Sequence, residues 1–214
     1  MRFIGMIAVL SGLVLAQTVA SQPRAEALYF TYLTKISSGQ QQTFERFLSE
    51  VKPIWDRHEM TVLARARIVD AYGTLGDGFA PTEFGLLRAA NRNAFNAYLS
   101  DPDYESIKEL RTNSAEYFFV LESVGSAEDG PDFLKKTPLV ALVLGTESKR
   151  REQANVALKI NLAAAVKGTV PASLLTPGHL RFHAVSYDDN PTAFFSDSDP
   201  DAILLIGENL IKQR

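Results

Sequence analysis

The sequence predicts an α+β fold in which a ferredoxin-like βαββαβ unit is followed by a second, incomplete βαββ copy. Strand-like and helix-periodic segments follow one another as strand, helix, strand, strand, helix, strand over residues 27–123, and the start of this order recurs after residue 137. This order is that of a split βαβ unit, which covers only one face of its sheet with helices. The other face therefore needs a partner or a ligand.

The first strand and helix of the unit are predicted from composition and from apolar spacing. Residues 27–36 are rich in Tyr, Phe, Thr and Ile, and Ser37 or Ser38 supplies a helix start. Apolar residues then recur at helical spacing, namely Phe44, Phe47, Leu48, Val51, Ile54 and Trp55. We expect this helix to lie on the sheet with Trp55 in the core. The alternative for Trp55 is a platform for a ligand.

The second strand, residues 61–69, places small or aliphatic residues on one side and two arginines on the other. Ala64 and Ala66 suit the side under the helices. Arg65 and Arg67 are therefore expected to point to the side that no helix of this unit covers.

The remaining elements of the first unit are a strand at 82–90, a helix from residue 91 or 93, and a strand at 116–123. Pro102 cannot lie inside a helix without the loss of a backbone hydrogen bond. We therefore expect the helix to stop and restart, with Asp101 as the cap and Pro102 in the first turn. The whole unit is assigned to residues 26–124.

The second half begins after a linker at residues 125–136, which is predicted from its Gly, Ser, Asp and Glu content. We expect a strand at 138–146, a helix at 148–167, and strands at 179–187 and 202–207, so that residues 137–214 form a truncated copy without its last helix and strand. If the repeat is real, the halves pair sheet to sheet within one chain. The alternative is that the tail is an unrelated extension.

Four segments of the first unit resemble the DUF1330 family: PIWDRHEM from Pro53, TVLARAR from Thr61, EFGLLRAA from Glu83, and YLSDPDYESIKELR from Tyr98. The resemblance departs from the family at Glu59-Met60, where a short glycine turn is usual. It implies the fold of the dimeric α+β barrel superfamily and pairing of two such units, either as a homodimer or as an intramolecular pseudo-dimer. The family often has a histidine at the position of His58.

The N-terminus predicts export. Met1-Arg2 is followed by an apolar run from Phe3 to Leu15 and then by small residues, which is the pattern of a secretory signal peptide at residues 1–20. Cleavage is expected after Ala16 or Ala20, and a periplasmic or secreted location follows. The alternative is an uncleaved anchor, but the run is shorter than the roughly 20 residues that cross a bilayer.

Composition narrows the range of partners. An apolar fraction of 46% and a charged fraction of 22% are ordinary for a globular protein. The formal charge of -3 gives no basic excess, so nucleic acid and anionic membranes are not expected as main partners. The chain has no cysteine, which excludes disulfides and a thiol nucleophile.

A candidate ligand site is predicted on the strand at 179–187, where His179, Arg181, His183 and Tyr187 share one face. If this face meets Arg65 and Arg67 in a cavity between the paired sheets, the site is rich in donors and suits a carboxylate or another small anion. The alternative is a sheet with one wet face. No metal is expected, since His179 and His183 are about 13 Å apart along an extended strand.

Two histidines are candidate catalytic residues. Histidine is the side chain that ordinarily changes charge near neutral pH, so His58 or His183 would serve as a proton acceptor. The alternative for His58 is a helix C-terminal cap. Motifs for nucleophiles, phosphate loops or dinucleotides are missing, and no cofactor is expected. The leading hypothesis is an exported binder of a small anionic molecule. The alternatives are a cofactor-independent monooxygenase- or isomerase-like enzyme, which rests on fold analogy, and a purely structural role.

Overall fold

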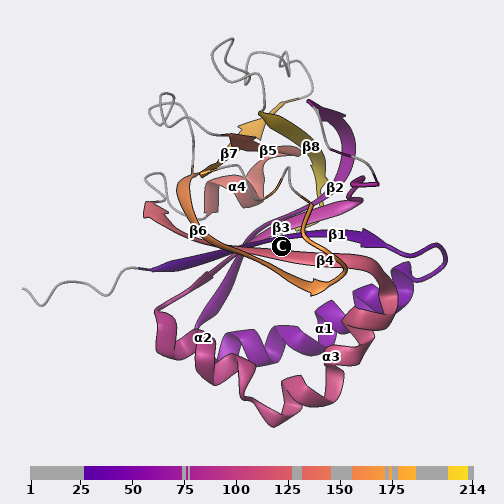
Figure 1. Cartoon of the computed structure of the whole chain (residues 1–214). Coiled ribbons are helices and arrows are strands. Elements are labelled where there is room, and N and C mark those ends of the chain that lie inside the picture. The colour runs from indigo at the N-terminus through magenta and orange to yellow at the C-terminus, as the bar shows by residue number, and fades with distance from the viewer. Residues whose placement is uncertain are drawn as a thin grey trace, which may run out of the picture.

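The computed structural model is an α+β protein (Figure 1). It describes residues 27–73, 76, 78–126, 132–145, 156–171, 174, 178–186 and 202–211. The elements of the first half are β1 (Leu28–Ile36), α1 (Gln41–Arg57), β2 (Met60–Tyr72), β3 (Glu83–Ala89), α2 (Arg92–Leu99), α3 (Pro102–Ser114) and β4 (Ala115–Ser126). Those of the second half are α4 (Asp132–Lys136), β5 (Leu139–Gly145), β6 (Val156–Lys167), β7 (His179–Val185) and β8 (Ile203–Asn209).

The eight strands form one closed barrel in the order β1-β3-β2-β8-β5-β7-β6-β4. Within this ring the first half contributes the run β4-β1-β3-β2, and the second half contributes the matching run β8-β5-β7-β6. The strand order therefore repeats, and the halves meet antiparallel at β2–β8 and at β4–β6. The sheet pairing expected of two units is made inside a single chain.

The second half differs from the prediction in one element. Residues 156–167, expected to be the end of a helix, form β6, which pairs with β4 and β7. Val156, Leu158 and Ile160 alternate toward the barrel interior, and a register shift near Ile160 follows. The alanines after the shift fit a helix as well as a strand, so their spacing does not distinguish the two. The rest of the predicted helix, 148–155, lies outside the described residues.

This correction changes how the two halves correspond. The strand that carries His179 and His183 is β7, which occupies the place of β3 in the repeat and not that of β2. The strand predicted at 202–207 is β8, which occupies the place of β4, so the last strand of the copy is present after all. The predicted linker at 125–136 contains the end of β4 and the short helix α4, and residues 127–131 lie outside the described set.

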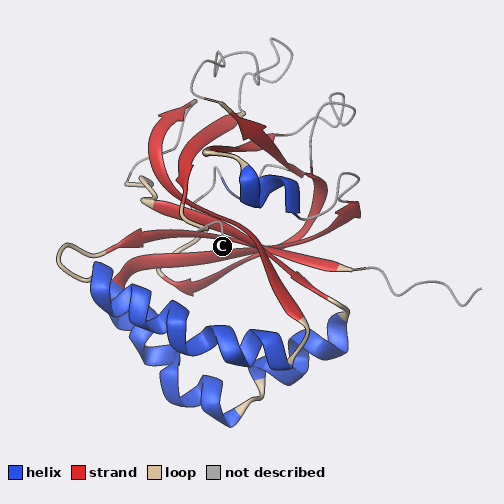
Figure 2. Ribbon diagram, turned by 180° about the vertical axis from the view of Figure 1, so that it is seen from behind, coloured by secondary structure: helices blue, strands red, loops and turns tan. Residues whose placement is uncertain are grey.

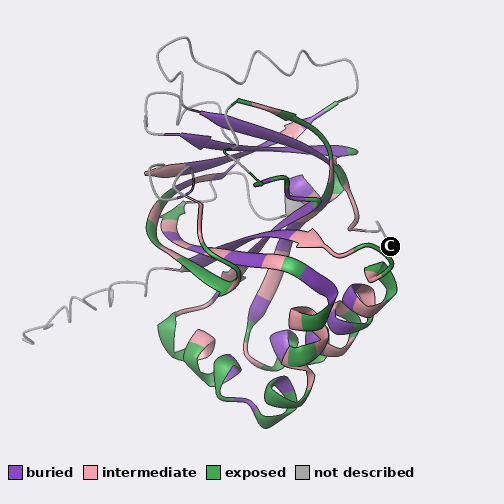
Figure 3. Cartoon of the chain, turned by 45° about the vertical axis from the view of Figure 1, so that its right-hand side comes forward, coloured by how far each residue is buried: buried purple, intermediate pink, exposed green. Residues whose placement is uncertain are grey.

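Two apolar layers hold the first half together. The barrel interior is filled by side chains from all eight strands, together with Leu134 of α4 and Phe79. A second cluster lies on the outer face of β1, β2, β3 and β4, where α1, α2 and α3 cover it (Figure 2). Buried residues follow the strands, whereas exposed residues follow the outer helix surfaces (Figure 3).

A glycine allows the close contact of the halves at the β2–β8 junction. A Cβ atom at Gly207 would lie 2.6 Å from Cβ of Ala66 and 3.0 Å from Cε1 of Phe84. Any larger residue at this position would push the halves apart inside the barrel.

The predicted interruption of the second helical segment is confirmed. The carboxylate of Asp101 accepts a hydrogen bond from the backbone N–H of Asp103 at 2.9 Å, and Pro102 is the first residue of α3. Asp101 thus caps α3, as the sequence predicted. Among the described helices, none combines the length and the apolar character that crossing a bilayer requires.

The direction of the β2 side chains is the reverse of the prediction. A register shift between Val62 and Ala64 puts both Leu63 and Ala64 into the interior cluster. Ala66 then also faces the interior, whereas Arg65 faces the helix layer. The small residues line the crowded inside of a closed barrel, which the sequence pattern alone did not distinguish from the side under the helices.

Candidate functional site

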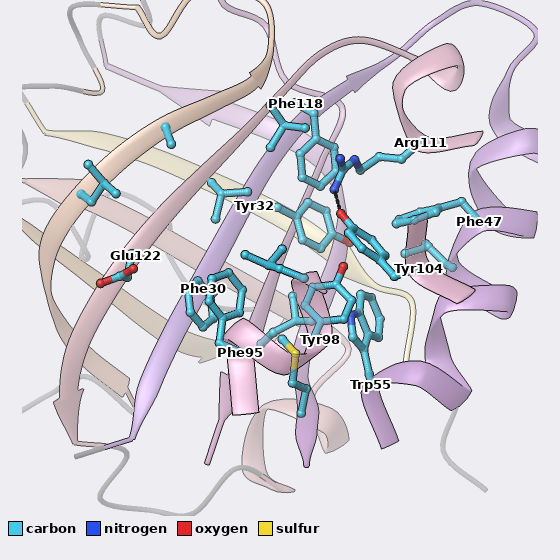
Figure 4. A pocket seen from close by; sticks show the side chains of 18 residues that line it. Phe30, Tyr32, Phe47, Trp55, Phe95, Tyr98, Tyr104, Arg111, Phe118 and Glu122 are labelled. Atoms are coloured by element: carbon cyan, nitrogen blue, oxygen red, sulfur yellow. Dashed lines mark hydrogen bonds between the residues drawn. The ribbon is translucent and has the colours of Figure 1, made fainter. Parts of the chain in front are cut away.

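A cavity of about 300 Å³ lies between the outer face of the sheet and the helix layer (Figure 4). Its sheet side is lined from β1, β2, β3, β4 and β6, and its helix side from α1, α2 and α3. The lining residues are Phe30, Tyr32, Phe47, Leu48, Trp55, Met60, Leu87, Phe95, Tyr98, Leu99, Tyr104, Arg111, Phe118, Val120, Glu122, Leu162, Ala164 and Val166.

Aromatic rings form most of its walls. Phe30 and Phe95 are stacked with centroids 3.8 Å apart, and Tyr98 and Tyr104 lie with centroids 4.4 Å apart. Flat apolar walls of this kind favour a flat apolar occupant, because ring faces and edges give it the largest contact area.

One cation, Arg111 of α3, lines this aromatic space. Its guanidinium lies 5.1 Å from the ring centroid of Phe118, 5.7 Å from that of Tyr104 and 5.8 Å from that of Phe47. Its Nη1 donates a hydrogen bond to the Tyr104 hydroxyl at 2.5 Å. Within the described part of the chain, no carboxylate forms an ion pair with Arg111, and its buried Nε has no acceptor.

The indole of Trp55 supplies a second donor. The ring lies next to Tyr98 (Figure 4), toward whose hydroxyl its buried Nε1–H is directed, but this N–H reaches full hydrogen-bond geometry with no acceptor of the described residues. A buried donor without a partner costs free energy. Burial, and then the neighbouring Tyr104, raise the pKa of Tyr98, so its hydroxyl stays protonated. The site thus offers donors to an oxygen atom.

The rim of the cavity includes exposed apolar side chains, namely Leu99, Leu162 and Val166. Leu162 and Val166 belong to β6, so the second half of the chain completes a cavity built mainly by the first. The Lys167 ammonium donates hydrogen bonds to the carbonyl oxygens of Thr112 (2.8 Å) and Ala115 (2.5 Å), which fixes β6 against the end of α3. The carboxylate of Glu122, also in the lining, is paired with Arg92.

Arg65, predicted to bind a ligand, is already bound by carboxylates of its own chain. Its guanidinium donates to both oxygens of Glu83, at 2.8 and 2.9 Å, and to both oxygens of Glu45, at 2.9 and 2.5 Å. Burial acts to lower the pKa of Arg65, but the hydrogen bonds to Glu83 and Glu45 outweigh it and raise this pKa. Tyr32 donates to Glu83 at 2.7 Å, and burial, with that carboxylate, raises the pKa of Tyr32. The network ties β1, β2, β3 and α1 together.

The other predicted ligand residues are not gathered around the barrel interior. Arg67 is exposed on the outer face of β2. His179, Arg181 and His183 do share one face of β7, as predicted, but Leu180 and Phe182 are the β7 residues that face the interior. Arg181 and His183 are buried and, like His179, take part in interactions within the protein. Tyr187 lies outside the described residues.

His58 is the C-cap of α1 and joins two helices. Its Nε2 lies 2.7 Å from Oδ2 of Asp101, which also accepts a hydrogen bond from Arg57 at 2.9 Å. The hydrogen bond from His58, followed by that from the backbone N–H of Asp103, lowers the pKa of Asp101. Neither His58 nor His183 lines the aromatic cavity.

A metal site is not indicated in the part of the chain that the structure describes, because no three potential His, Cys, Asp or Glu ligands come together there. The residues of this candidate site that the sequence pattern does not single out are Tyr104 and Arg111, and Trp55 is predicted as core with a ligand platform as the alternative. Their signal is a cation seven residues after Tyr104 on the buried side of α3, where aliphatic residues are usual.

The comparisons with known proteins give weak likenesses. No protein-family model and no curated protein matches the chain, so the DUF1330 resemblance stays a prediction. Among solved structures, a putative monooxygenase from Lactobacillus acidophilus is 9% identical, with a TM-score of 0.46, over 88% of this chain and 100% of that one.

Two further structures are similar at the same low level. An anthrone oxidase-like protein is 10% identical with a TM-score of 0.46, over 86% of this chain and 91% of that one. A dabb family protein with a ferredoxin-like fold from Mesorhizobium loti is 14% identical with a TM-score of 0.32, over 47% of this chain and 98% of that one. The strand order of the barrel, and not these likenesses, establishes the architecture.

Proposed function

We propose that the chain binds a flat, largely apolar small molecule that carries an oxygen acceptor. The observation that carries this proposal is Arg111, a cation that lies among aromatic rings and has no carboxylate partner in the described part of the chain. An oxygen of the ligand would accept from Arg111 and Trp55, and the ring would lie against the aromatic walls.

This proposal keeps a small-molecule ligand, as in the sequence-based hypothesis, but makes it largely apolar and moves its site. The barrel interior is packed with apolar side chains, and Arg65 is bound by Glu83 and Glu45. The helix side of the sheet instead combines space, apolar walls, and N–H groups of Arg111 and Trp55 that no carboxylate of the described residues accepts from. Export remains a prediction from residues 1–20, which lie outside the described residues.

Calorimetric titration of the mature protein with 2-naphthoate and with naphthalene tests the proposal. We expect 2-naphthoate to bind at least about tenfold more tightly, because a hydrogen bond to a charged donor contributes about 1.5–3 kcal/mol. Arg111→Met should remove this difference. The matched control is Arg46→Met, which removes an exposed arginine of α1 that does not line the cavity. Equal binding of both compounds by the unaltered protein would contradict the proposal.

Turnover of the bound molecule is a second candidate function. A guanidinium without a carboxylate partner would stabilise an oxyanion formed from a phenol or an enol, as a cofactor-independent oxygenase or isomerase requires. Oxygen uptake or isomerisation of a bound phenol, measured without added cofactor or metal, tests this candidate. Loss of turnover in Arg111→Met, with turnover kept in Arg46→Met, would support it, and absence of turnover in the unaltered protein would exclude it for that phenol. The variants His58→Ala and His183→Ala test the two predicted bases.

A further inference from the structure

A second cavity, of about 480 Å³, adjoins the first beneath α1. It opens toward β2 and the end of the described chain, and its lining includes Val62, Leu210 and Ile211. Both cavities lie on the outer face of the sheet. The first extends from α1 toward α2, α3 and β6, whereas the second extends toward β2 and α4.

The two cavities share five lining side chains: Tyr32, Leu48, Trp55, Met60 and Leu87. These five side chains, named here the neck, separate one space from the other. The Tyr32 ring is held in the neck by its hydrogen bond to Glu83 at 2.7 Å and by Gly85, where a Cβ atom would lie 2.2 Å from Cε1 of that ring. Leu48, by contrast, is a half-buried side chain of α1.

The lining of the second cavity differs from that of the first in charge. It contains Lys52, Arg65 and Lys135 against a single carboxylate, that of Asp56. Lys52 and Asp56 form an exposed i,i+4 pair at 2.6 Å, with 66% and 61% of their side-chain surfaces accessible. A pair of this kind is weak, so an incoming anion competes with it readily. Arg65 is held by Glu83 and Glu45, so the exposed Lys52 is the main attraction for an anion.

We infer that a single elongated ligand occupies both cavities, with its ring system in the first and an anionic end in the second. This inference rests on the proposed function and adds to it the ligand class, an aromatic compound with an acidic side chain. The side chain of the ligand would pass through the neck between Leu48 and the sheet, and its carboxylate would lie near Lys52. The neck side chains would then set the length of tail that is accepted.

The test uses one ring with tails of increasing length. The probes are 2-naphthol, which fills the first cavity only, and (6-hydroxy-2-naphthyl)alkanoates with acid chains of two to six carbons, titrated by calorimetry. We expect up to about fourfold tighter binding for each methylene that enters the neck, which is the transfer free energy of a buried CH₂ expressed as a ratio of affinities.

Two variants connect this gain to the neck and to the second cavity. Leu48→Trp fills the neck and should abolish the dependence on tail length. Because Leu48 also lines the first cavity, the affinity of each acid is compared with that of 2-naphthol for the same variant. Lys52→Ala should weaken the long-tailed acids about two- to fivefold, in line with an exposed ion pair. The matched control, Lys108→Ala, removes the lysine of another exposed pair, with Glu105 on α3, and should have no effect.

The outcomes separate this inference from the proposed function. The elongated ligand would be overturned if affinity did not change with tail length in the unaltered protein, or if the length dependence persisted in Leu48→Trp. Binding of 2-naphthol would still support the first cavity as a binding site. Loss of 2-naphthol binding in the unaltered protein would instead overturn the proposed function itself.

Discussion

The barrel interior and the layer beneath the helices are both apolar, yet they differ in what fills them. The interior is packed with Leu, Val, Ala and Phe side chains of all eight strands. The helix layer contains more large aromatic rings, and cavities remain between them. The difference indicates that the interior contributes mainly stability, whereas the layer gives up some packing for a binding space.

The largest expected loss of stability comes from a substitution in the barrel interior. Phe84 is fully buried there and faces Phe182 with ring centroids 6.3 Å apart. Phe84→Ala should lower the free energy of unfolding by about 3–5 kcal/mol, because it leaves a cavity that the closed barrel cannot collapse. Urea denaturation measures this loss. The control, Leu162→Ala on the exposed rim, should change stability by about 0.5 kcal/mol or less, and a comparable loss in both variants would contradict the comparison.

A smaller loss is expected from the carboxylate that holds Arg65. Glu83 is 1% exposed and accepts hydrogen bonds from Arg65 and Tyr32. Glu83→Gln should cost about 3 kcal/mol, since it leaves a largely buried guanidinium with one partner fewer. Glu45→Gln should cost about 1 kcal/mol or less, because the side chain of Glu45 is 45% exposed. Thermal unfolding of the two variants under identical conditions ranks these losses. A larger loss for Glu45→Gln than for Glu83→Gln would contradict the expectation that the buried carboxylate stabilises the fold more than the exposed one.

Gly85 gives a test that couples the two regions. A methyl group at this position would overlap the Tyr32 ring, which lines both cavities. Gly85→Ala should therefore cost about 1–3 kcal/mol through overpacking and should also alter the binding of 2-naphthol. Calorimetry and urea denaturation of the same sample measure both effects. Unchanged binding together with unchanged stability would show that the Tyr32 ring moves to another position without cost, which would contradict its assigned fixed place.

The smallest expected effect concerns pH. The hydrogen bond from His58 lowers the pKa of Asp101 below its ordinary value of 3.8. A carboxyl group whose pKa is lower in the folded protein stabilises the fold fully above the unfolded value, and this contribution disappears as pH falls through the folded value.

The melting temperature of the unaltered protein should therefore fall toward that of Asp101→Asn as pH decreases from about 5 to about 2.5. Asp56→Asn, which changes an exposed carboxylate of α1, is the matched control. A constant difference between the unaltered protein and Asp101→Asn across this range would contradict the assigned hydrogen bond.

The sequence was sufficient to predict the order of helices and strands in the first unit, because the periodicity of its apolar residues is clear. The stripe from Phe44 to Trp55 fits only a helix, and Asp101-Pro102 allows only a break and a restart. In the second half, Val156, Leu158 and Ile160 alternate as a strand does, but the alanines that follow fit either period. The local sequence pattern does not distinguish helix from strand in this segment. Pairing with β4 and β7 makes it a strand.

The site was less predictable, because its position depends on which face of the sheet has room. The charge pattern found Arg65, but sequence spacing does not reveal that Glu45 and Glu83 reach it. Tyr104 and Arg111 appear in the sequence as an ordinary buried helix face. Only the tertiary arrangement shows that no carboxylate of the described residues joins them.

Closure of the ring has a consequence for how the molecule could be divided. Each half leaves two strand edges that only the other half covers, β2 and β4 from the first and β6 and β8 from the second. The unpaired N–H and C=O groups of such exposed strand edges form hydrogen bonds with the backbone of other chains. Two polypeptides cut between α4 and β4 would therefore behave as complementary subunits, each aggregating alone and each rescuing the other when produced together.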